Sequence, residues 1–477
     1  MTAGFASEHS LLTRDAGLYP DLTANQEIRT IAPRSHTKHH NFCSAIIHLF
    51  ASNSPSLMRF GVSGLKAKAA RVFILLESLV LVSCGSYSSP SSSTSNTTGA
   101  KLRAFITNPI SPGTIGTAPV VEVVDALKDK LAGAFGLSNT QPGLMVVFPN
   151  KRFTLVYNGG NNSITRIQNA TESVSGTALS LPGATESIVV APDNVTGYAA
   201  VPTAAVNGQG QGVVEVLNLS SNTIIATIPV PGAHFVALSH DGGRVLVFGV
   251  QTSRFSGLAV ITPSLIGTSQ NPVFEFPPNA AFDHPVGGAF SSDGSTAFVL
   301  NCGAECGGTA ASVTPLDMNS NTLGSPVPVD AATVGMLSGT TLYVAGTPPS
   351  CPAGAIAPSC GTLSVIDTSS MTVTNQNPIF NTDGYHNHME MGADGQLFIG
   401  ARTCSAGCLS IFDTNPNGKV TLPSDTGDVT GIQPITTRHV VYVCENGELR
   451  IYDTTTDKLQ AGQIDIIGQA VDVKLVD

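Results

Sequence analysis

A short apolar strand pattern recurs along this chain from residue 101 onward, at a spacing of roughly 45 to 50 residues. Several copies follow a tight turn such as Asp241-Gly242 or Asp293-Gly294. Asp-Gly pairs readily supply the positive φ angles that two-residue hairpin turns require. The eight copies are Arg103–Asn108, Arg152–Asn158, Gly197–Val201, Arg244–Phe248, Thr296–Asn301, Thr341–Ala345, Gln396–Gly400 and Val440–Cys444.

A further strand follows most copies and often ends in Asp or Asn, as in Val213–Asn218, and a fourth stretch then runs like Thr223–Ile228. Such units predict four-stranded antiparallel sheets, which must stack on their neighbours to bury both faces. Composition agrees, because only 12% of the residues are charged and Lys and Glu are scarce, which argues against a long helical protein. We therefore predict an all-β fold, a β-propeller.

The two ends of the repeat region indicate how the ring closes. The first copy lacks a leading strand, and the chain ends with an unassigned strand, Ala470–Val476. We expect this C-terminal strand to complete the first blade, since closure removes the open sheet edges that invite aggregation. Eight blades are then predicted, with seven as the alternative if one divergent unit is an insertion.

The order of strands and turns resembles the YVTN-type β-propeller repeat of bacterial surface proteins and lipoproteins. The pairs Arg103–Asn108 with Val120–Asp125 and Thr341–Ala345 with Leu363–Asp367 carry this resemblance. It covers about residues 101–477 and implies a fold without implying a ligand. The fold is also similar to that of propeller lactonases.

A basic segment and an apolar run precede the repeats. Four basic residues follow Met58, and Val72–Val82 is too short to span a bilayer. The run ends in Leu81-Val82-Ser83-Cys84-Gly85, which resembles a bacterial lipoprotein signal. The resemblance implies cleavage before Cys84 and lipidation of its sulfur, and several lipid chains anchor a protein stably. Glu77 inside the run and the internal position of the signal favour the alternative, a disordered extension before an ordinary membrane-proximal segment.

These features divide the chain into four predicted parts. Residues 1–57 are upstream sequence translated in error or a disordered leader, and residues 58–84 are the lipoprotein signal. Residues 85–100 form a flexible Ser/Thr-rich tether, and residues 101–477 form the propeller. We expect an extracytoplasmic protein, lipid-anchored to the bacterial cell envelope, and Gly85 after the lipidated cysteine favours the outer membrane.

Charge excludes one class of partner. Removal of residues 1–84 leaves 15 basic and 28 acidic residues, a net charge of −13, which repels phosphate backbones. Nucleic-acid binding is therefore not expected. We expect a monomer that meets a membrane through its anchor and a protein, glycan or small molecule through its loops.

Six of the nine cysteines form close pairs after the second strand of successive repeats. Such recurrence predicts local disulfides in an oxidising compartment, whereas metal ligation is the alternative interpretation. Cys444 is left over as a buried free thiol. The predicted disulfides are Cys302–Cys306, Cys351–Cys360 and Cys404–Cys408.

Several histidines lie just before or within the first strand predicted for a blade. Because first strands line the centre of a propeller, the candidate ligand face consists of His234, Asp283, His284, His386, His388 and Arg402. The spacing of His386 and His388 puts both imidazoles on one side of a regular strand, which is compatible with a divalent metal. The alternative is that these histidines only hydrogen-bond neighbouring blades, and no cofactor is then required.

Two functions follow. The first is a non-catalytic binding scaffold that displays a rigid loop face, and it requires no special residues. The second is a lactonase-like hydrolase, with candidate catalytic residues His284, His386, His388, Glu390 and Arg402. In it, a metal would polarise the lactone carbonyl, Glu390 would serve as base and Arg402 would stabilise the oxyanion. This second function rests on similarity of fold, which is a weak guide to activity.

Overall fold

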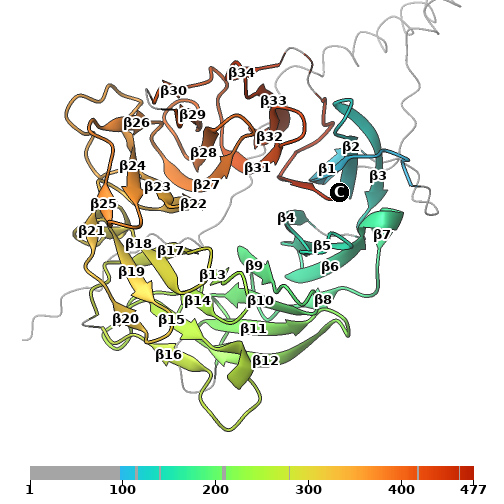
Figure 1. Cartoon of the computed structure of the whole chain (residues 1–477). Coiled ribbons are helices and arrows are strands. Elements are labelled where there is room, and N and C mark those ends of the chain that lie inside the picture. Colours follow the sequence, from blue (N-terminus) through green and yellow to red (C-terminus); the bar gives the residue numbers. More distant parts are fainter. Residues whose placement is uncertain are drawn as a thin grey trace, which may run out of the picture. The chain divides into compact units, whose positions relative to one another are not determined.

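The computed structural model describes residues 97–477 except 113–116, 139–140, 207–210, 279, 416–417, 461 and 463. All of them belong to one compact unit, Ser88–Asp477. Their strands form eight antiparallel sheets around a ring, and the inner strand of each sheet contacts the inner strands of both neighbouring sheets (Figure 1). The chain is therefore an eight-bladed β-propeller, as predicted.

The blades are numbered here in chain order, and each is given from its inner to its outer strand. Blade 1 contains β35 (Asp472–Leu475), β1 (Arg103–Pro112), β2 (Thr117–Asp125) and β3 (Lys130–Gly136). Blade 2 contains β4 (Pro142–Val147), β5 (Phe153–Asn158), β6 (Ser163–Gln168), β7 (Ser173–Val174) and β8 (Leu179–Ser180). Blade 3 contains β9 (Ser187–Val190), β10 (Thr196–Val201), β11 (Val213–Asn218) and β12 (Thr223–Pro229). Blade 4 contains β13 (Phe235–Leu238), β14 (Val245–Phe248), β15 (Leu258–Ile261) and β16 (Val273–Glu275).

The other four blades repeat this order. Blade 5 contains β17 (Pro285–Phe290), β18 (Thr296–Asn301), β19 (Ser312–Asp317), β20 (Thr322–Leu323) and β21 (Val327–Pro328). Blade 6 contains β22 (Val334–Ser338), β23 (Thr341–Gly346), β24 (Gly361–Asp367), β25 (Thr372–Val373) and β26 (Ile379–Asn381). Blade 7 contains β27 (Tyr385–Met391), β28 (Gln396–Arg402), β29 (Leu409–Asp413) and β30 (Val420–Thr421). Blade 8 contains β31 (Val429–Ile435), β32 (Val440–Glu445), β33 (Glu448–Asp453) and β34 (Lys458–Leu459).

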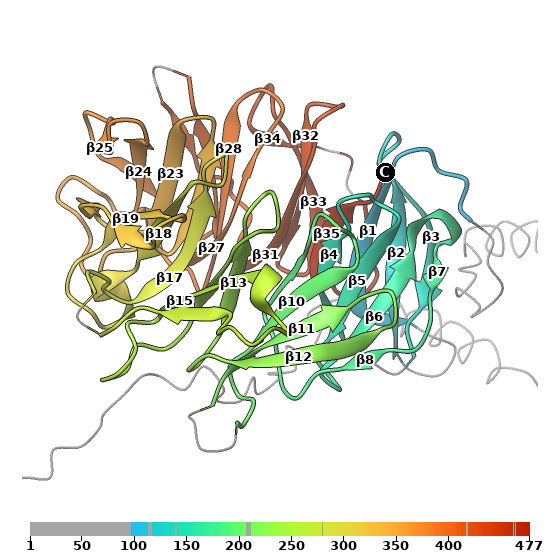
Figure 2. The same cartoon turned by 60° about the horizontal axis from the view of Figure 1, so that its bottom comes forward.

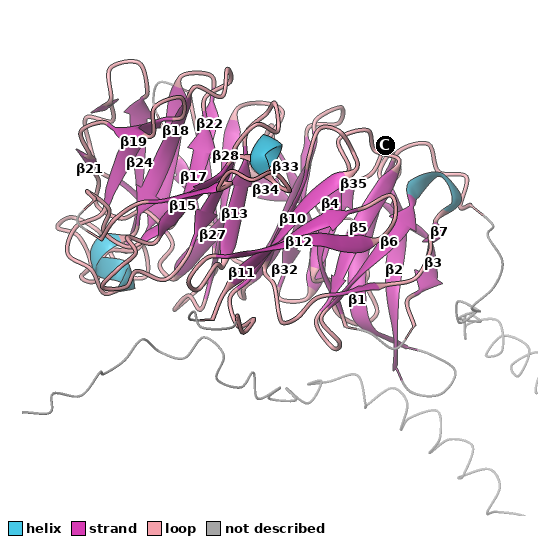
Figure 3. Cartoon of the chain, turned by 90° about the horizontal axis from the view of Figure 1, so that it is seen from below, coloured by secondary structure: helices cyan, strands magenta, loops and turns pink. Residues whose placement is uncertain are grey.

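In blades 2, 5 and 6 the fourth strand is split into two short pieces that both pair with the third strand. Helical structure in the described residues is limited to three short 3₁₀ segments, seen in Figure 3: η1 (Asn169–Thr171), η2 (Pro263–Leu265) and η3 (Gly303–Cys306). No helix among these residues has the length and hydropathy needed to cross a bilayer.

The apolar second strands are explained by burial on both faces. All four residues of β14 are buried. Val245 and Val247 pack into a cluster shared with blade 3, whereas Leu246 and Phe248 pack into a cluster shared with blade 5. Because successive side chains of a strand point to opposite faces, stacked blades require apolar residues at every position. Figure 2 shows the stacked sheets from the side.

The ring closes as predicted, because β35 pairs with β1 in the register Ala104↔Leu475 and Thr107↔Asp472. The C-terminus lies beside blade 1 in Figure 1. Asp472 extends the closure to blade 2, since its carboxylate accepts a hydrogen bond from the backbone N–H of Met145 at 2.7 Å.

Inner strands begin and second strands end on the same side of the ring, and the connections between second and third strands lie there too. We call this side the loop face. Of the predicted N-terminal parts, the leader and the lipoprotein signal with Cys84 lie outside the described residues. Thr98, at the end of the predicted tether, donates hydrogen bonds to Glu172 at 2.7 and 2.8 Å, so the folded unit begins slightly before residue 101.

Candidate ligand site on the loop face

Three disulfides staple the loop face of three successive blades, as predicted. Cys302–Cys306 lies in blade 5, Cys351–Cys360 in blade 6 and Cys404–Cys408 in blade 7, each in the connection between the second and third strands. Cys444 is a buried free thiol, also as predicted.

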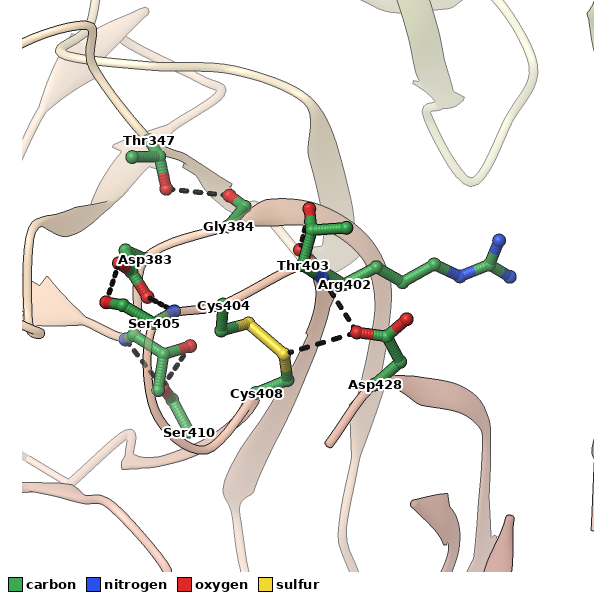
Figure 4. The surroundings of a disulfide bond; sticks show 11 residues. Thr347, Asp383, Gly384, Arg402, Thr403, Cys404, Ser405, Cys408, Ser410 and Asp428 are labelled. Carbon is green, nitrogen blue, oxygen red and sulfur yellow. Dashed lines mark hydrogen bonds between the residues drawn. A yellow bond between two sulfur atoms is a disulfide. The ribbon is translucent and has the colours of Figure 1, made fainter. Parts of the chain in front are cut away.

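Hydrogen bonds join these stapled loops to their neighbours (Figure 4). The hydroxyl of Thr347 in blade 6 donates to the carbonyl oxygen of Gly384, just before blade 7, at 2.8 Å. The backbone N–H of Thr403 donates to the carboxylate of Asp428, just before blade 8, at 2.7 Å. Asp383 accepts a hydrogen bond from the backbone N–H of Ser405 at 3.0 Å. The loop face of blades 6 to 8 is therefore cross-linked by hydrogen bonds from blade to blade.

Asp283 and His284 make their contacts within blade 5. The carboxylate of Asp283 accepts hydrogen bonds from the backbone N–H groups of Thr309 and Ala310, both at 2.8 Å, and lies 3.0 Å from Nδ1 of His284. Burial opposes ionisation of Asp283, but a hydrogen bond from the Thr309 hydroxyl at 2.5 Å, together with these contacts, outweighs it and lowers the pKa to about 2. The carboxylate thus organises the blade 5 loop.

The two histidines of β27 lie on opposite faces of blade 7, so the expectation of a shared side is wrong. The pairing shifts from His386↔Ala401 to His388↔Gly400, which makes Asn387 a β-bulge. A bulge inserts one residue and reverses the alternation of side chains beyond it. His386 faces blade 6, because a Cβ on Gly361 would lie 2.9 Å from its Cε1 atom.

His386 is fully buried, and neither of its ring nitrogens makes a hydrogen bond of normal geometry with a described residue. Loss of hydration lowers its pKa to about 4, which the Thr382 backbone and the Asp383 charge only partly oppose. Its imidazole is therefore neutral at pH 7. His234 is half-buried near the carbonyl oxygen of Gly232, at 3.2 Å, and burial lowers its pKa as well.

His388 and Glu390 lie within electrostatic range of Lys474, while Arg402 acts on His388 and Asp472 acts on Glu390. For Asp472 and Lys474 the sequence indicates only a place in the closing strand. Burial lowers the pKa of His388 to about 3, and the charges of Lys474 and Arg402 add to this effect. Burial also raises the pKa of Glu390. The positive charge of Lys474 opposes this rise, and the negative charge of Asp472 adds to it. Lys474 pairs with Asp472 at 3.2 Å. Among the described residues, the Arg402 guanidinium has no hydrogen-bond partner at Nε and no ion pair.

A shallow cleft of about 340 Å³ opens on the loop face, and none of these five residues lines it, although Thr403, next to Arg402 in the chain, does. Sequence analysis did not single out Glu305 or Tyr385 in its lining, although the position of Glu305 within the Cys302–Cys306 loop was a usable signal. The lining comes from three blades: Ala304, Glu305, Thr347, Pro348, Pro349, Gly384, Tyr385 and Thr403.

The described residues contain no group of three or more His, Cys, Asp or Glu side chains arranged to hold a metal ion. The residues proposed for a metal, His386 and His388, point away from each other across the bulge. Their arrangement therefore does not form a shared two-histidine site.

Comparisons with known proteins give similarity of fold alone. No family model and no curated protein sequence matches the chain. The structure of dihydro-heme d1 dehydrogenase NirN in complex with DHE is similar, with a TM-score of 0.53 and 13% identity over 79% of this chain and 75% of that one. AztD from Citrobacter koseri gives a TM-score of 0.49 at 13% identity, covering 78% and 96% of the two chains. A functionally unknown protein from Desulfotomaculum acetoxidans gives 0.47 at 12% identity, covering 78% and 98%.

At this identity the likeness establishes the class alone, an eight-bladed β-propeller. No particular relative is defined by sequence. The chemical groups on its own loop face are therefore the guide to its function.

Proposed function

We propose that the protein is a lipid-anchored, extracytoplasmic propeller of the YVTN-repeat kind that acts as a non-catalytic binding scaffold. The observation that carries this proposal is the row of three disulfide-stapled loops on adjacent blades, which border one cleft. Ligand sites are concave and carry a few polar groups, and this shallow cleft is lined by Glu305, Thr347 and Tyr385 from three different blades. A rigid surface also reduces the entropy lost on binding.

The polar groups near the cleft support binding more than chemistry. Asp283, His284 and His386 are engaged in or buried within their own blades. Arg402 and Glu305 have no ion pair among the described residues, and an unpaired charge near a cleft is a natural contact for a ligand.

A lactonase-like hydrolase is the second candidate, and the grouping of His388, Glu390 and Arg402 favours it. A neutral imidazole beside an arginine and a carboxyl group of raised pKa could assist attack by water. The hydrolase predicted from the sequence also required His284 and His386, which lie elsewhere. The second candidate therefore keeps three of its five residues.

Hydrogen-exchange footprinting of the full chain tests the scaffold. A panel of glycans, peptides and small amines, acids and lactones is added, and exchange is followed in residues 302–311, 347–360 and 403–408. We expect one ligand class to protect these three loops while the Asp241-Gly242 turn on the opposite side stays unchanged. Protection confined to the opposite side, or lactone turnover that His388→Ala and Glu390→Gln abolish, would contradict the scaffold.

Anchoring is tested separately by metabolic labelling with an alkyne fatty acid in a bacterial host. We expect the full chain to be labelled and found in the membrane fraction, and the Cys84→Ser variant to be unlabelled and released. Equal labelling of the two chains would contradict an anchor at Cys84.

A further inference from the structure

We propose that the cleft between Glu305 and Tyr385 binds an alkylammonium group. This inference rests on the proposed scaffold function and names the chemistry that its loop face recognises. The cleft presents a carboxylate, an aromatic ring and two prolines, and none of the residues in its lining is basic.

Two constraints hold Glu305 in place. It lies in η3, between the half-cystines of the Cys302–Cys306 disulfide. One carboxylate oxygen accepts a hydrogen bond from the backbone N–H of Thr347 at 2.9 Å. Gly346 leaves room for that oxygen, since a Cβ there would lie 2.8 Å from it. The carboxylate is therefore fixed without any cation.

The second oxygen of Glu305 has no hydrogen-bond or ion-pair partner among the described residues. A carboxylate with a single free oxygen suits the point charge of an ammonium group, whereas a guanidinium is bound best by two oxygens at once. A divalent cation is a poor fit, because the cleft lining offers this one carboxylate and no group of three metal-binding side chains.

Tyr385 supplies the second element of ammonium recognition. Tyr385 lies at the start of β27, and the residue is 45% exposed. A cation is attracted to the face of an aromatic ring, and the effect grows when the cation leaves water. Pro348 and Pro349 provide apolar surface for the methylene stem of a primary amine.

The charges around Tyr385 also favour a cation. Partial burial is the main cause that raises the pKa of Tyr385, and the charges of Glu305 and Glu186 raise it further, whereas Arg402 lowers it. Two carboxylates thus act on this point against one guanidinium, and Arg402 does not line the cleft.

The test titrates the full chain in detergent at about pH 8.5 with n-butylammonium and, as a neutral analogue, n-butanol. This pH lies above the raised pKa of Glu305, about 7, and below the pKa of an alkylammonium, about 10.4, so both groups are charged. Glu305→Gln keeps the shape of the side chain and its hydrogen bond with Thr347, so the variant should fold, which thermal unfolding verifies. Glu275→Gln, on the exposed outer strand of blade 4, is the matched loss of charge. We expect saturable ammonium binding that Glu305→Gln weakens at least tenfold, Tyr385→Leu weakens several-fold and Glu275→Gln leaves unchanged.

A second pair of probes separates two sources of the same group. A short peptide with one lysine is compared with the same peptide acetylated at that lysine, alongside 1,4-diaminobutane. Tighter binding of the lysine peptide indicates a protein-borne ammonium, and tighter binding of the diamine indicates a free amine.

The absence of saturable binding, or equal binding by wild type and Glu305→Gln, overturns the ammonium proposal. If another ligand still protects the three stapled loops in that case, the scaffold function survives. If no ligand protects them, both proposals fail.

Discussion

At the scale of single residues, burial decides which groups carry charge. Glu305 and Glu445 both have a pKa raised to about 7, chiefly because burial disfavours the carboxylate. Hydrogen bonds from the Thr347 backbone and the Tyr452 hydroxyl oppose this rise. His386 and His388 show the same effect with the opposite sign, since burial lowers their pKa to about 4 and about 3.

We predict that Glu305→Gln and Glu445→Gln reduce the loss of stability between pH 4.5 and 7. A carboxyl group with a raised folded pKa binds more protons in the folded state in this window, so stability falls as pH rises through it. The effect is on the order of 2 kcal/mol for each group. Urea unfolding at several pH values measures it, and variants with the same pH slope as wild type would contradict the assignment.

We predict that His386→Leu is at least as stable as wild type at pH 7. The substitution removes a buried imidazole that makes no hydrogen bond of normal geometry with a described residue, and burial of such a group costs about 1 to 3 kcal/mol. Because the folded pKa of His386 is depressed, wild type also loses stability as pH falls from about 6.5 to about 4, and the variant should lose less. A destabilisation above about 2 kcal/mol at pH 7 would show that the ring nitrogens have partners.

At the scale of elements, the strands were predictable and their irregularities were not. All eight repeat copies are second strands, because two-faced burial requires apolar residues in an unmistakable pattern. The bulge at Asn387 has no such signal, so the His-Asn-His sequence predicts a regular strand. Similar register shifts near the start of β17 and β31 show that inner strands of this ring often bulge there.

Contacts between blades were the other feature that sequence could not supply. Glu305 and Thr347 are joined by the stacking of blades 5 and 6, and no local pattern encodes that contact. Recurrence did reveal the disulfides, because the same loop carries a cysteine pair in three successive units.

We predict that Cys404→Ser/Cys408→Ser lowers the free energy of unfolding by about 2 kcal/mol, the chain-entropy value for so short a loop. The backbone N–H groups of Thr403 and Ser405, which donate to Asp428 and Asp383, should then exchange their protons faster, since these hydrogen bonds depend on the disulfide-closed loop. Urea unfolding and amide exchange measure these effects. Unchanged stability and exchange would show that the hydrogen bonds alone fix the loop.

At the scale of the whole molecule, stability depends on the join between the chain ends. β35 pairs with β1, and Arg103 and Asp477 form an ion pair beside that join. Asp472 links β35 to blade 2 and neutralises Lys474. The pKa of Lys474 is raised, because the attraction of Asp472 and Glu390 exceeds the effect of burial.

We predict that Asp472→Asn costs about 3 kcal/mol, because it removes the ion-pair partner of the largely buried Lys474 ammonium and leaves only the longer-range attraction of Glu390. Lys128→Met removes the Lys128–Asp125 ion pair, in which the lysine side chain is 70% exposed. It should cost under about 1 kcal/mol. Urea unfolding compares the two. Equal and small effects would show that the closure does not depend on this pair.

The most direct test of the central claim is the fate of the bound ligand. A ligand that protects the stapled loops is incubated with the full chain, released by unfolding and identified by mass spectrometry. A non-catalytic scaffold predicts one ligand per chain, recovered unchanged after prolonged incubation. Recovery as a hydrolysed product, and its loss in the His388→Ala variant, would contradict the scaffold and establish an enzyme.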